Sequence, residues 1–387
     1  MTETVTDPFS PAVRVAEAVK ADIAETTASA PSAQIKLFQP ITLRGLTIKN
    51  RIWLAPMCQY SAVDGVVNNF HLVHYGARAL GGFGLLIAEA TGVTPEGRIT
   101  PGCAGIWNDE QVKAWLPIVD EVHKGGAKFA IQLQHSGRKG SAAVPWAPET
   151  NVSAPISDGG WETVGPTAEA FPGLAAPHAL TTEEVAAIPE AFAAAAQRAD
   201  EAGFDAVEIH AAHGYLLHQF LSPLTNTRSD QYGGSPENRV RLLYEVASAI
   251  RAVFPAEKPV FVRVSASDWT EGGLTPEIVA TVINGLAERG VDFCDTSSGG
   301  LLPAPIQHGP GYQVPFAAAI RERTSIPVGA VGSITEAAQA EQILEDGKAD
   351  VILVARAGLR DPMWPLRVAH DLGVQVPWPV QYDRAPF

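Results

Sequence analysis

Residues 206–215 of this chain have the sequence Ala-Val-Glu-Ile-His-Ala-Ala-His-Gly-Tyr. The apolar run at its start follows the turn-like Gly203-Phe204-Asp205, which is the pattern of a buried β-strand. The strand then presents His210, His213 and Tyr215 in quick succession. In α/β barrels, the side chains that carry out chemistry stand at the carboxyl ends of the parallel strands. The stretch therefore predicts a strand that ends in a small polar site.

The same succession of a short apolar strand, a turn and an Ala/Leu/Glu-rich helix continues along the chain. Strands are predicted at 51–55, 85–89, 129–134, 206–210, 260–264, 293–296, 328–331 and 351–355. Helices are predicted between them, for example at 109–124, 182–202, 236–254, 276–289 and 335–346. Eight such strands are typical of a parallel sheet that closes into a (β/α)8 TIM barrel. A doubly wound open sheet is less favoured, because no G-x-G-x-x-G follows the first strand.

Composition limits the partners of the protein. Of its 387 residues 46% are hydrophobic and 18% are charged, and the net charge is −14. An acidic chain lacks the basic face that nucleic acids and anionic membranes require. No apolar run approaches the roughly 18 residues of a membrane span, and the amino terminus has no secretory signal. Cys58, Cys103 and Cys294 form no C-x-x-C pair, so a cytoplasmic protein without disulfides or cysteine-held clusters is expected.

Two segments depart from the repeating pattern. Residues 1–35 are rich in Ala, Thr, Ser and acidic residues and are expected to form a flexible extension, which leaves 36–387 for the barrel. Residues 136–180 form a long Pro-, Gly- and Trp-containing segment after the third strand. Loops of this length in compact domains are usually lids or binding loops. We expect this one to cap the mouth of the barrel.

The last strand ends indicate a phosphate site. Gly332-Ser333 follows the seventh strand and Arg356 follows the eighth, where barrels commonly bind phosphate through backbone N–H groups. Arg263 lies between valines in the fifth strand, and its burial is costly unless an anion or acceptor pairs with it. Together with Gln132 in the third strand, these groups suggest a phosphate-bearing flavin across the mouth, with Arg263 at its electron-rich edge.

Three motifs in this sequence resemble those of the old yellow enzyme family. They are Pro-Met-Cys-Gln-Tyr-Ser at 56–61, His-Ala-Ala-His-Gly-Tyr at 210–215 and Asp-Gln-Tyr-Gly-Gly-Ser-Pro-Glu-Asn-Arg at 230–239. The resemblance covers roughly residues 36–387 and is greatest to the thermophilic-like ene-reductase branch, which includes the xenobiotic reductases. It implies a TIM barrel with tightly but non-covalently bound FMN that NADPH or NADH reduces. The implied substrates are activated alkenes, namely α,β-unsaturated carbonyl or nitro compounds.

The resemblance also implies a role for each site residue. Hydride would pass from the flavin to the β-carbon while His210 and His213 hold the substrate oxygen. A proton would reach the α-carbon from Tyr215 or from solvent. Tyr60 would also contact the substrate oxygen, and Cys58 would modulate the flavin. The implied cofactor contacts are Ala55, Pro56, Met57, Cys58, Ala90, Gln132, His210, Arg263, Gly332, Ser333, Ala355 and Arg356.

The end of the chain resembles the segment of this branch that carries an arginine into the active site of a neighbouring subunit. Arg384 occupies the matching position, although Ala-Pro-Phe follows it where the branch usually has Gly and an aromatic residue. The resemblance therefore implies a homo-oligomer, either a dimer or a tetramer of dimers, with Arg384 binding substrate across the interface.

The residues alone leave two other interpretations of the site open, one for the histidine pair and one for Cys58. His210 and His213 could bind a metal in a flavin-free barrel hydrolase or lyase, with Glu208 on the same strand face as His210. A metal site usually needs a third protein ligand, so no metal is predicted. Cys58 could instead be an inert buried thiol.

Overall fold

The computed structural model describes residues 35–387. All of the predicted flexible extension except Ile35 lies outside these residues. Eight parallel strands close into a barrel in the order β10-β11-β12-β3-β4-β5-β8-β9, which confirms the TIM barrel and excludes the open sheet. The barrel strands are β3 (Ile52–Leu54), β4 (Leu85–Gly92), β5 (Lys128–Gln134), β8 (Ala206–Ala211), β9 (Val260–Ser265), β10 (Phe293–Ser297), β11 (Val328–Ala330) and β12 (Val351–Val354). Each coincides with a predicted strand.

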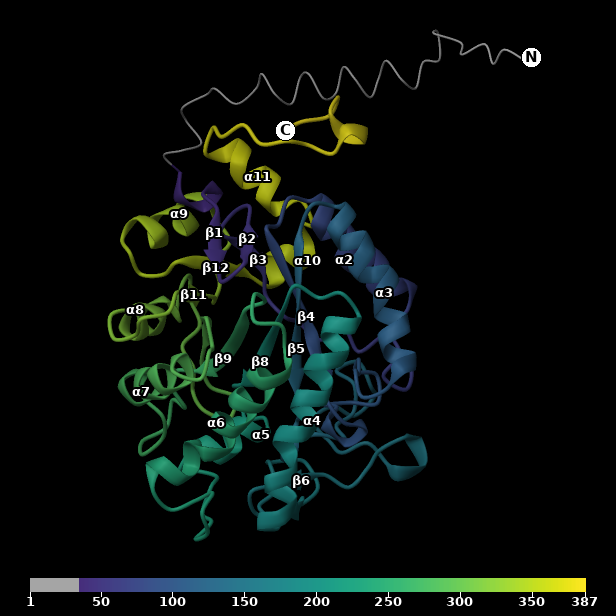
Figure 1. Cartoon of the computed structure of the whole chain (residues 1–387), viewed down its shortest axis with the longest axis vertical. Coiled ribbons are helices and arrows are strands. Elements are labelled where there is room, and N and C mark those ends of the chain that lie inside the picture. Colours follow the sequence, from purple (N-terminus) through teal and green to yellow (C-terminus); the bar gives the residue numbers. More distant parts are fainter. Residues whose placement is uncertain (1–34) are drawn as a thin grey trace, which may run out of the picture.

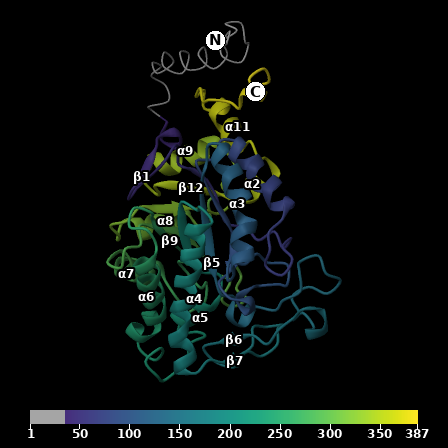
Figure 2. The same cartoon turned by 45° about the vertical axis from the view of Figure 1, so that its right-hand side comes forward.

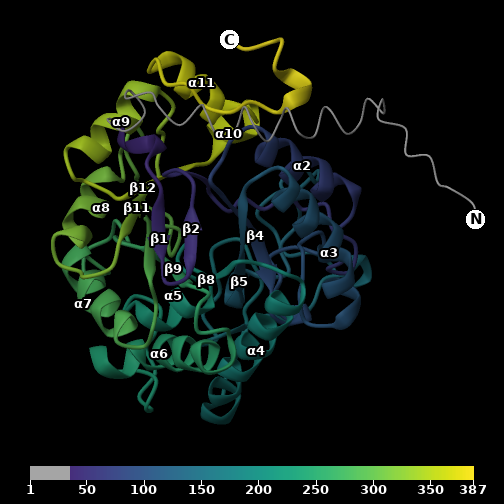
Figure 3. The same cartoon turned by 45° about the horizontal axis from the view of Figure 1, so that its top comes forward.

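Helices surround the barrel, as Figure 3 shows. Their starts are set by local chemistry: Asn68, Asn108 and Thr181 cap their helices through reciprocal capping boxes. Proline occupies the first turn of four others, where its missing N–H costs nothing. The main helices are α2 (Asn69–Leu80), α3 (Asp109–Lys124), α4 (Thr182–Glu201), α6 (Pro236–Val253), α7 (Pro276–Ala287), α8 (Val314–Arg321) and α9 (Ala337–Glu345), with α5 (Leu216–Leu221), α10 (Arg356–Arg360) and α11 (Trp364–Asp371) after strand ends or near the carboxyl terminus.

The barrel interior has an apolar floor. Trp53, Phe261 and Phe293 pack against one another there, with ring centroids 4.7–5.7 Å apart. Below them lies a hairpin of β1 (Ile41–Leu43) and β2 (Leu46–Ile48), whose inward residues join the same buried cluster. Sequence analysis did not predict this hairpin, because two three-residue strands are too short to show a clear period. The floor closes the amino ends of the strands, so a ligand can reach the interior polar groups only from the carboxyl ends.

The segment after β5 is an ordered excursion. It contains two 3-10 turns and a short parallel pair, β6 (Val164–Gly165) and β7 (His178–Ala179). The carboxyl terminus and β6 lie at opposite ends of the molecule (Figures 1 and 2). Within residues 35–387, no helix is both long and apolar enough to cross a bilayer.

The aromatic floor gives a stability prediction. Trp53 is fully buried, and its indole N–H donates to the carbonyl of Asn50. Trp53→Ala should lower the free energy of unfolding by about 3–5 kcal/mol, because it leaves a cavity between two phenylalanine rings. Ile156→Ala, at a side chain that is 73% exposed, is the control and should change it by less than about 0.5 kcal/mol. Urea unfolding followed by circular dichroism measures the free energy of unfolding of both variants. If both variants lost the same amount, the floor would not be tightly packed.

Candidate active site

The end of β8 places two imidazoles and a phenol together. The ring centroids of His210 and His213 lie 5.2 Å apart, and those of His210 and Tyr215 lie 5.0 Å apart, both edge to face. His210 is almost fully buried, and Nδ1 of its side chain has no hydrogen-bond partner within residues 35–387. His213 has a positive φ of 58°, which turns the chain sharply after the strand. The convergence predicted from the motif is therefore present.

A second wall of the site comes from the ends of β3 and β4. Cys58, Tyr60 and Tyr215 pack against a small buried cluster of Ala90, Ile99 and Cys103. The loop after β3 is held in place by a carboxylate of β4, because the backbone N–H of Gln59 donates to Glu89 at 3.0 Å. Four of the predicted site residues thus meet although they are far apart in sequence.

Polar side chains line the barrel interior below the histidines. Strand register pairs Gln132 with Glu208, and pairs Arg263 with both His210 and Asp295. The amide of Gln132 donates to Glu208 at 2.8 Å, and Nε of Arg263 lies 3.1 Å from an Asp295 oxygen. The buried charge of Arg263 predicts an anion or acceptor beside it. The sequence does not identify Asp295 as this partner, because only the pairing of β9 with β10 brings the two side chains close.

This interior layer is close to neutral in net charge. Burial raises the pKa of Glu208 to about 8, so it carries a proton at neutral pH. Burial also raises the pKa of Asp295, to about 6, although Arg263 opposes the change. At neutral pH, Asp295 therefore balances Arg263. Nε of Arg263 and one Glu208 oxygen still lack a well-aligned hydrogen-bond partner.

The histidines are neutral and the tyrosines are protonated. Burial is the main cause that holds the pKa of both His210 and His213 well below the ordinary imidazole value, and the nearby charge of Arg263 adds to it. Burial raises the pKa of Tyr60 and Tyr215 above the ordinary phenol value. Each imidazole therefore carries one N–H, and each phenol keeps its O–H across the neutral range.

A polar cavity of about 310 Å³ lies beside Arg263, at the ends of β11 and β12. Gly332 has a φ of +121°, and a Cβ there would come within 3.0 Å of the Gln313 side chain. Ser333 follows with a φ of +52°. The full lining is Arg263, Ser297, Tyr312, Gln313, Val331, Gly332, Ser333, Ile334, Thr335, Leu353, Ala355, Arg356, Ala357 and Arg360. A glycine-bearing loop and several arginines fit a phosphate, and the guanidinium of Arg263, which lines the same cavity, fits the electron-rich edge of a flavin.

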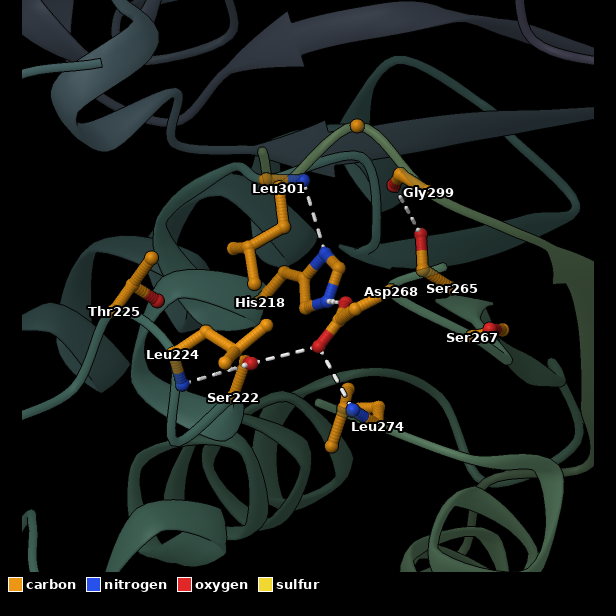
Figure 4. Close-up of polar contacts among 12 residues, drawn as sticks. His218, Ser222, Leu224, Thr225, Ser265, Ser267, Asp268, Leu274, Gly299 and Leu301 are labelled. Carbon is orange, nitrogen blue, oxygen red and sulfur yellow. Dashed lines mark hydrogen bonds and ion pairs between the residues drawn. The ribbon is translucent and has the colours of Figure 1, made fainter. Parts of the chain in front are cut away.

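A buried network supports the positive-φ turn from behind (Figure 4). The backbone N–H of Gly214 donates to Nδ1 of His218. Nε2 of His218 therefore carries the proton and donates to Asp268 at 2.8 Å. The other Asp268 oxygen accepts from the hydroxyl of Ser222 and the N–H of Leu274. The network fixes the position of the backbone at His213.

The sequence motifs did not identify two further residues of the site, Lys139 and Ser297. Lys139, at the start of the excursion, donates 2.8 Å hydrogen bonds to the carbonyls of His213 and Gly300. Burial lowers its pKa to about 8. Ser297 lies 2.7 Å from Nε2 of His213 and also hydrogen-bonds Gln313. None of these contacts has a local sequence signal, although Lys139 stands directly after the strand-end His135-Ser136-Gly137-Arg138.

Arg384 is not part of the site within its own chain. It is exposed, and the segment that carries it ends with Phe387 packed against Arg367, His370 and Trp378. Across residues 35–387, no three His, Cys, Asp or Glu side chains are grouped as a metal would require. Glu208 shares the interior with His210 and accepts a hydrogen bond from Gln132.

The raised pKa of Glu208 gives a pH prediction. Folded Glu208 keeps a proton that the unfolded chain releases, so its contribution to stability is lost as pH rises from about 5 to about 8. Glu208→Gln should remove this loss. Between the low and the high end of that range, the free energy of unfolding of the variant should rise relative to that of the native protein by at least about 1.4 kcal/mol, the equivalent of one pKa unit. Urea unfolding at several pH values measures the gap. Glu149→Gln, at an exposed position, is the control, and its difference from the native protein should not change with pH. If the difference for Glu208→Gln also stayed constant with pH, Glu208 would not be protonated in the folded protein.

The lowered pKa of the site histidines gives a second prediction. Nuclear magnetic resonance of the imidazole protons should show no titration of His210 or His213 between about pH 5 and pH 8, where an ordinary imidazole changes charge. Signals are assigned with His210→Asn and His213→Asn. A titration midpoint near pH 6.5 for either imidazole would show that water reaches that ring and that burial does not lower its pKa.

Comparisons with known proteins agree with this geometry. A sequence profile of the NADH:flavin oxidoreductase / NADH oxidase family matches residues 36–375. An NADPH dehydrogenase of Halalkalibacterium halodurans is 47% identical over 352 residues, which cover 90% of this chain and 98% of that protein. The Bacillus subtilis NADPH dehydrogenase is 46% identical with the same coverage.

Solved structures give the same result. Morphinone reductase has a TM-score of 0.74 at 31% identity, covering 90% of this chain and 93% of that one. The old yellow enzyme homologue from Zymomonas mobilis has a TM-score of 0.74 at 30% identity, covering 91% of this chain and 99% of that one. The residues of the barrel mouth fit a flavin, and the profile match and the relatives agree with that fit. This chain therefore belongs to the old yellow enzyme family of FMN-dependent NAD(P)H oxidoreductases.

Proposed function

We propose that this oxidoreductase reduces the C=C bond of α,β-unsaturated carbonyl and nitro compounds. The observation that carries the proposal is the pair of neutral imidazoles at the end of β8, next to a protonated tyrosine. Bound FMN, once reduced by NADPH or NADH, supplies hydride to the β-carbon of the alkene. Everything else must come from the side chains of the barrel mouth.

His210 and His213 hold the substrate oxygen. A neutral imidazole N–H in a low-dielectric site stabilises negative charge that develops on a carbonyl or nitro oxygen. Nε2 of His213 lies 2.7 Å from the hydroxyl of Ser297, which fixes the orientation of that ring. Nδ1 of His210 has no hydrogen-bond partner in the part of the chain that the structure describes. Tyr60, whose hydroxyl is protonated, provides a further contact to the same oxygen.

Tyr215 delivers the proton to the α-carbon. Its ring stands edge-on to His210, and Lys139 lies 5.1 Å from the ring centroid. A positive charge at this distance stabilises negative charge left on the phenol oxygen when the proton leaves. Solvent then restores the proton.

The excursion at 136–180 acts as a lid, and a second copy of the chain completes the site. Trp146 in the excursion contacts Tyr60 with ring centroids 5.9 Å apart, and Phe171 lies over Lys139. Arg384 is exposed and outside its own site, which suits a homo-oligomer in which it reaches a neighbouring pocket. Three free thiols suit a reducing compartment such as the cytoplasm.

The visible spectrum and a phenol titration test the proposal. The purified protein should carry the absorption bands of a flavin, and phenol should perturb them by binding at the oxygen anchor. The double variant His210→Ala/His213→Ala should keep its flavin but bind phenol at least about tenfold more weakly, because two hydrogen bonds are lost. His123→Ala, at the end of α3, is the control. Unchanged phenol binding in the double variant would overturn the anchor assignment, and a protein that cannot be loaded with FMN would overturn the function.

A further inference from the structure

We propose that Cys58 and Cys103 are a redox-active pair that a hydroperoxide converts reversibly into a disulfide beside the flavin site. The pair joins the loop after β3 to the loop after β4, two strands that are neighbours in the barrel. No role in catalysis is needed for Cys103, which the motif analysis did not single out as a site residue.

The two thiols already interact in the folded chain. Cys58 packs against the cluster that contains Cys103, and the two side chains share a hydrogen bond. Cys103 is held further by Thr100, whose backbone N–H and hydroxyl lie 3.3 and 3.5 Å from its sulfur. The backbone N–H of Ala90 donates to Cys58. A bond between the sulfurs would link the two loops that carry them.

Cys294 offers a comparison within the same chain. It is buried on β10 and hydrogen-bonds the hydroxyl of Thr296, with no cysteine beside it in residues 35–387. These three are the only cysteines in the sequence. The protein thus contains one thiol pair and one isolated thiol, which makes the products of oxidation easy to tell apart.

The shared hydrogen bond also sets the reactivity of the pair. Burial opposes ionisation of Cys103, but the hydrogen bonds from Cys58 and Thr100 outweigh it and lower the pKa of Cys103. The same hydrogen bond, together with burial, raises the pKa of Cys58. The pair therefore loses its first proton more easily than two separate buried thiols would, and it is the thiolate that reacts. Cys58 is partly exposed, whereas Cys103 is fully buried.

Oxidation proceeds in two steps. Cys103 ionises first and then accepts the proton of Cys58, so the negative charge moves to the partly exposed Cys58 sulfur. The Cys58 thiolate attacks one oxygen of hydrogen peroxide; the O–O bond breaks, and hydroxide leaves and takes up a proton as water. The Cys103 sulfur, giving up its proton, then attacks the Cys58 sulfenic acid; the S–S bond forms, the S–O bond breaks, and a second water leaves. Two thiols lose two electrons in total, and one peroxide is reduced to two waters.

The consequence for activity rests on the proposed function. Cys58 packs beside Tyr60 and Tyr215, so a disulfide would remove its thiol from the site and tie down the loop that carries Tyr60. Peroxide should therefore lower alkene reduction, and a dithiol reductant should restore it.

Thiol counting on the FMN-loaded, folded protein is the direct test. The untreated protein, denatured before labelling, should give three thiols. After brief exposure to hydrogen peroxide it should give one, which peptide mapping assigns to Cys294, and the peptides of Cys58 and Cys103 should be linked. Dithiothreitol should restore all three. This assay uses no alkene, so its outcome is independent of whether the proposed substrates are correct.

Two variants complete the test. Cys294→Ala should form the same linkage with no thiol left over. Cys103→Ala should form none, and its Cys58 should instead be trapped as a sulfenic acid by dimedone. The proposal is overturned if peroxide leaves Cys58 and Cys103 unlinked in Cys294→Ala, if the link joins two chains, or if it appears only after denaturation.

Discussion

Arg263 is buried in the interior of the barrel, and the chemistry of the mouth depends on how its charge is balanced. A guanidinium group in a nearly dry interior requires a compensating anion. Asp295 on the neighbouring strand provides one, while Glu208 stays protonated and adds no second negative charge. The layer is thus held near neutrality before any cofactor arrives. The guanidinium of Arg263 also lines the cavity at the ends of β11 and β12, where it fits the electron-rich edge of a flavin.

The rigidity of the oxygen anchor comes from contacts behind it. His213 occupies a left-handed conformation that costs free energy for a residue with a side chain. Lys139 on its carbonyl, Ser265 on its N–H and His218 on the next N–H hold it there. Several independent contacts therefore offset the cost of this backbone conformation. We expect the imidazole of His213 to keep its position at the strand end when a ligand binds.

The sequence predicted what depends on periodicity and on local motifs. All eight barrel strands, the helices with capping boxes and the convergence of His210, His213 and Tyr215 could be derived, because each signal lies within a short window. Asp295, Lys139 and Cys103 could not be assigned roles, since their partners lie on other strands and are set only by barrel register. The hairpin at 41–48 was missed for a different reason: its two strands have too few residues for alternation to be recognised.

The neutrality of the histidines follows from the same electrostatics that fit the site to an anionic ligand. A protonated imidazole would be a stronger donor to a developing oxyanion, but it would have to be buried next to Arg263 and Lys139. Those cations are there to meet negative charge, so a third cation would be repelled and would lose its hydration as well. The stable solution is a pair of neutral N–H donors with two fixed cations near them. Negative charge is then stabilised where it forms, while the resting site holds little excess charge of its own.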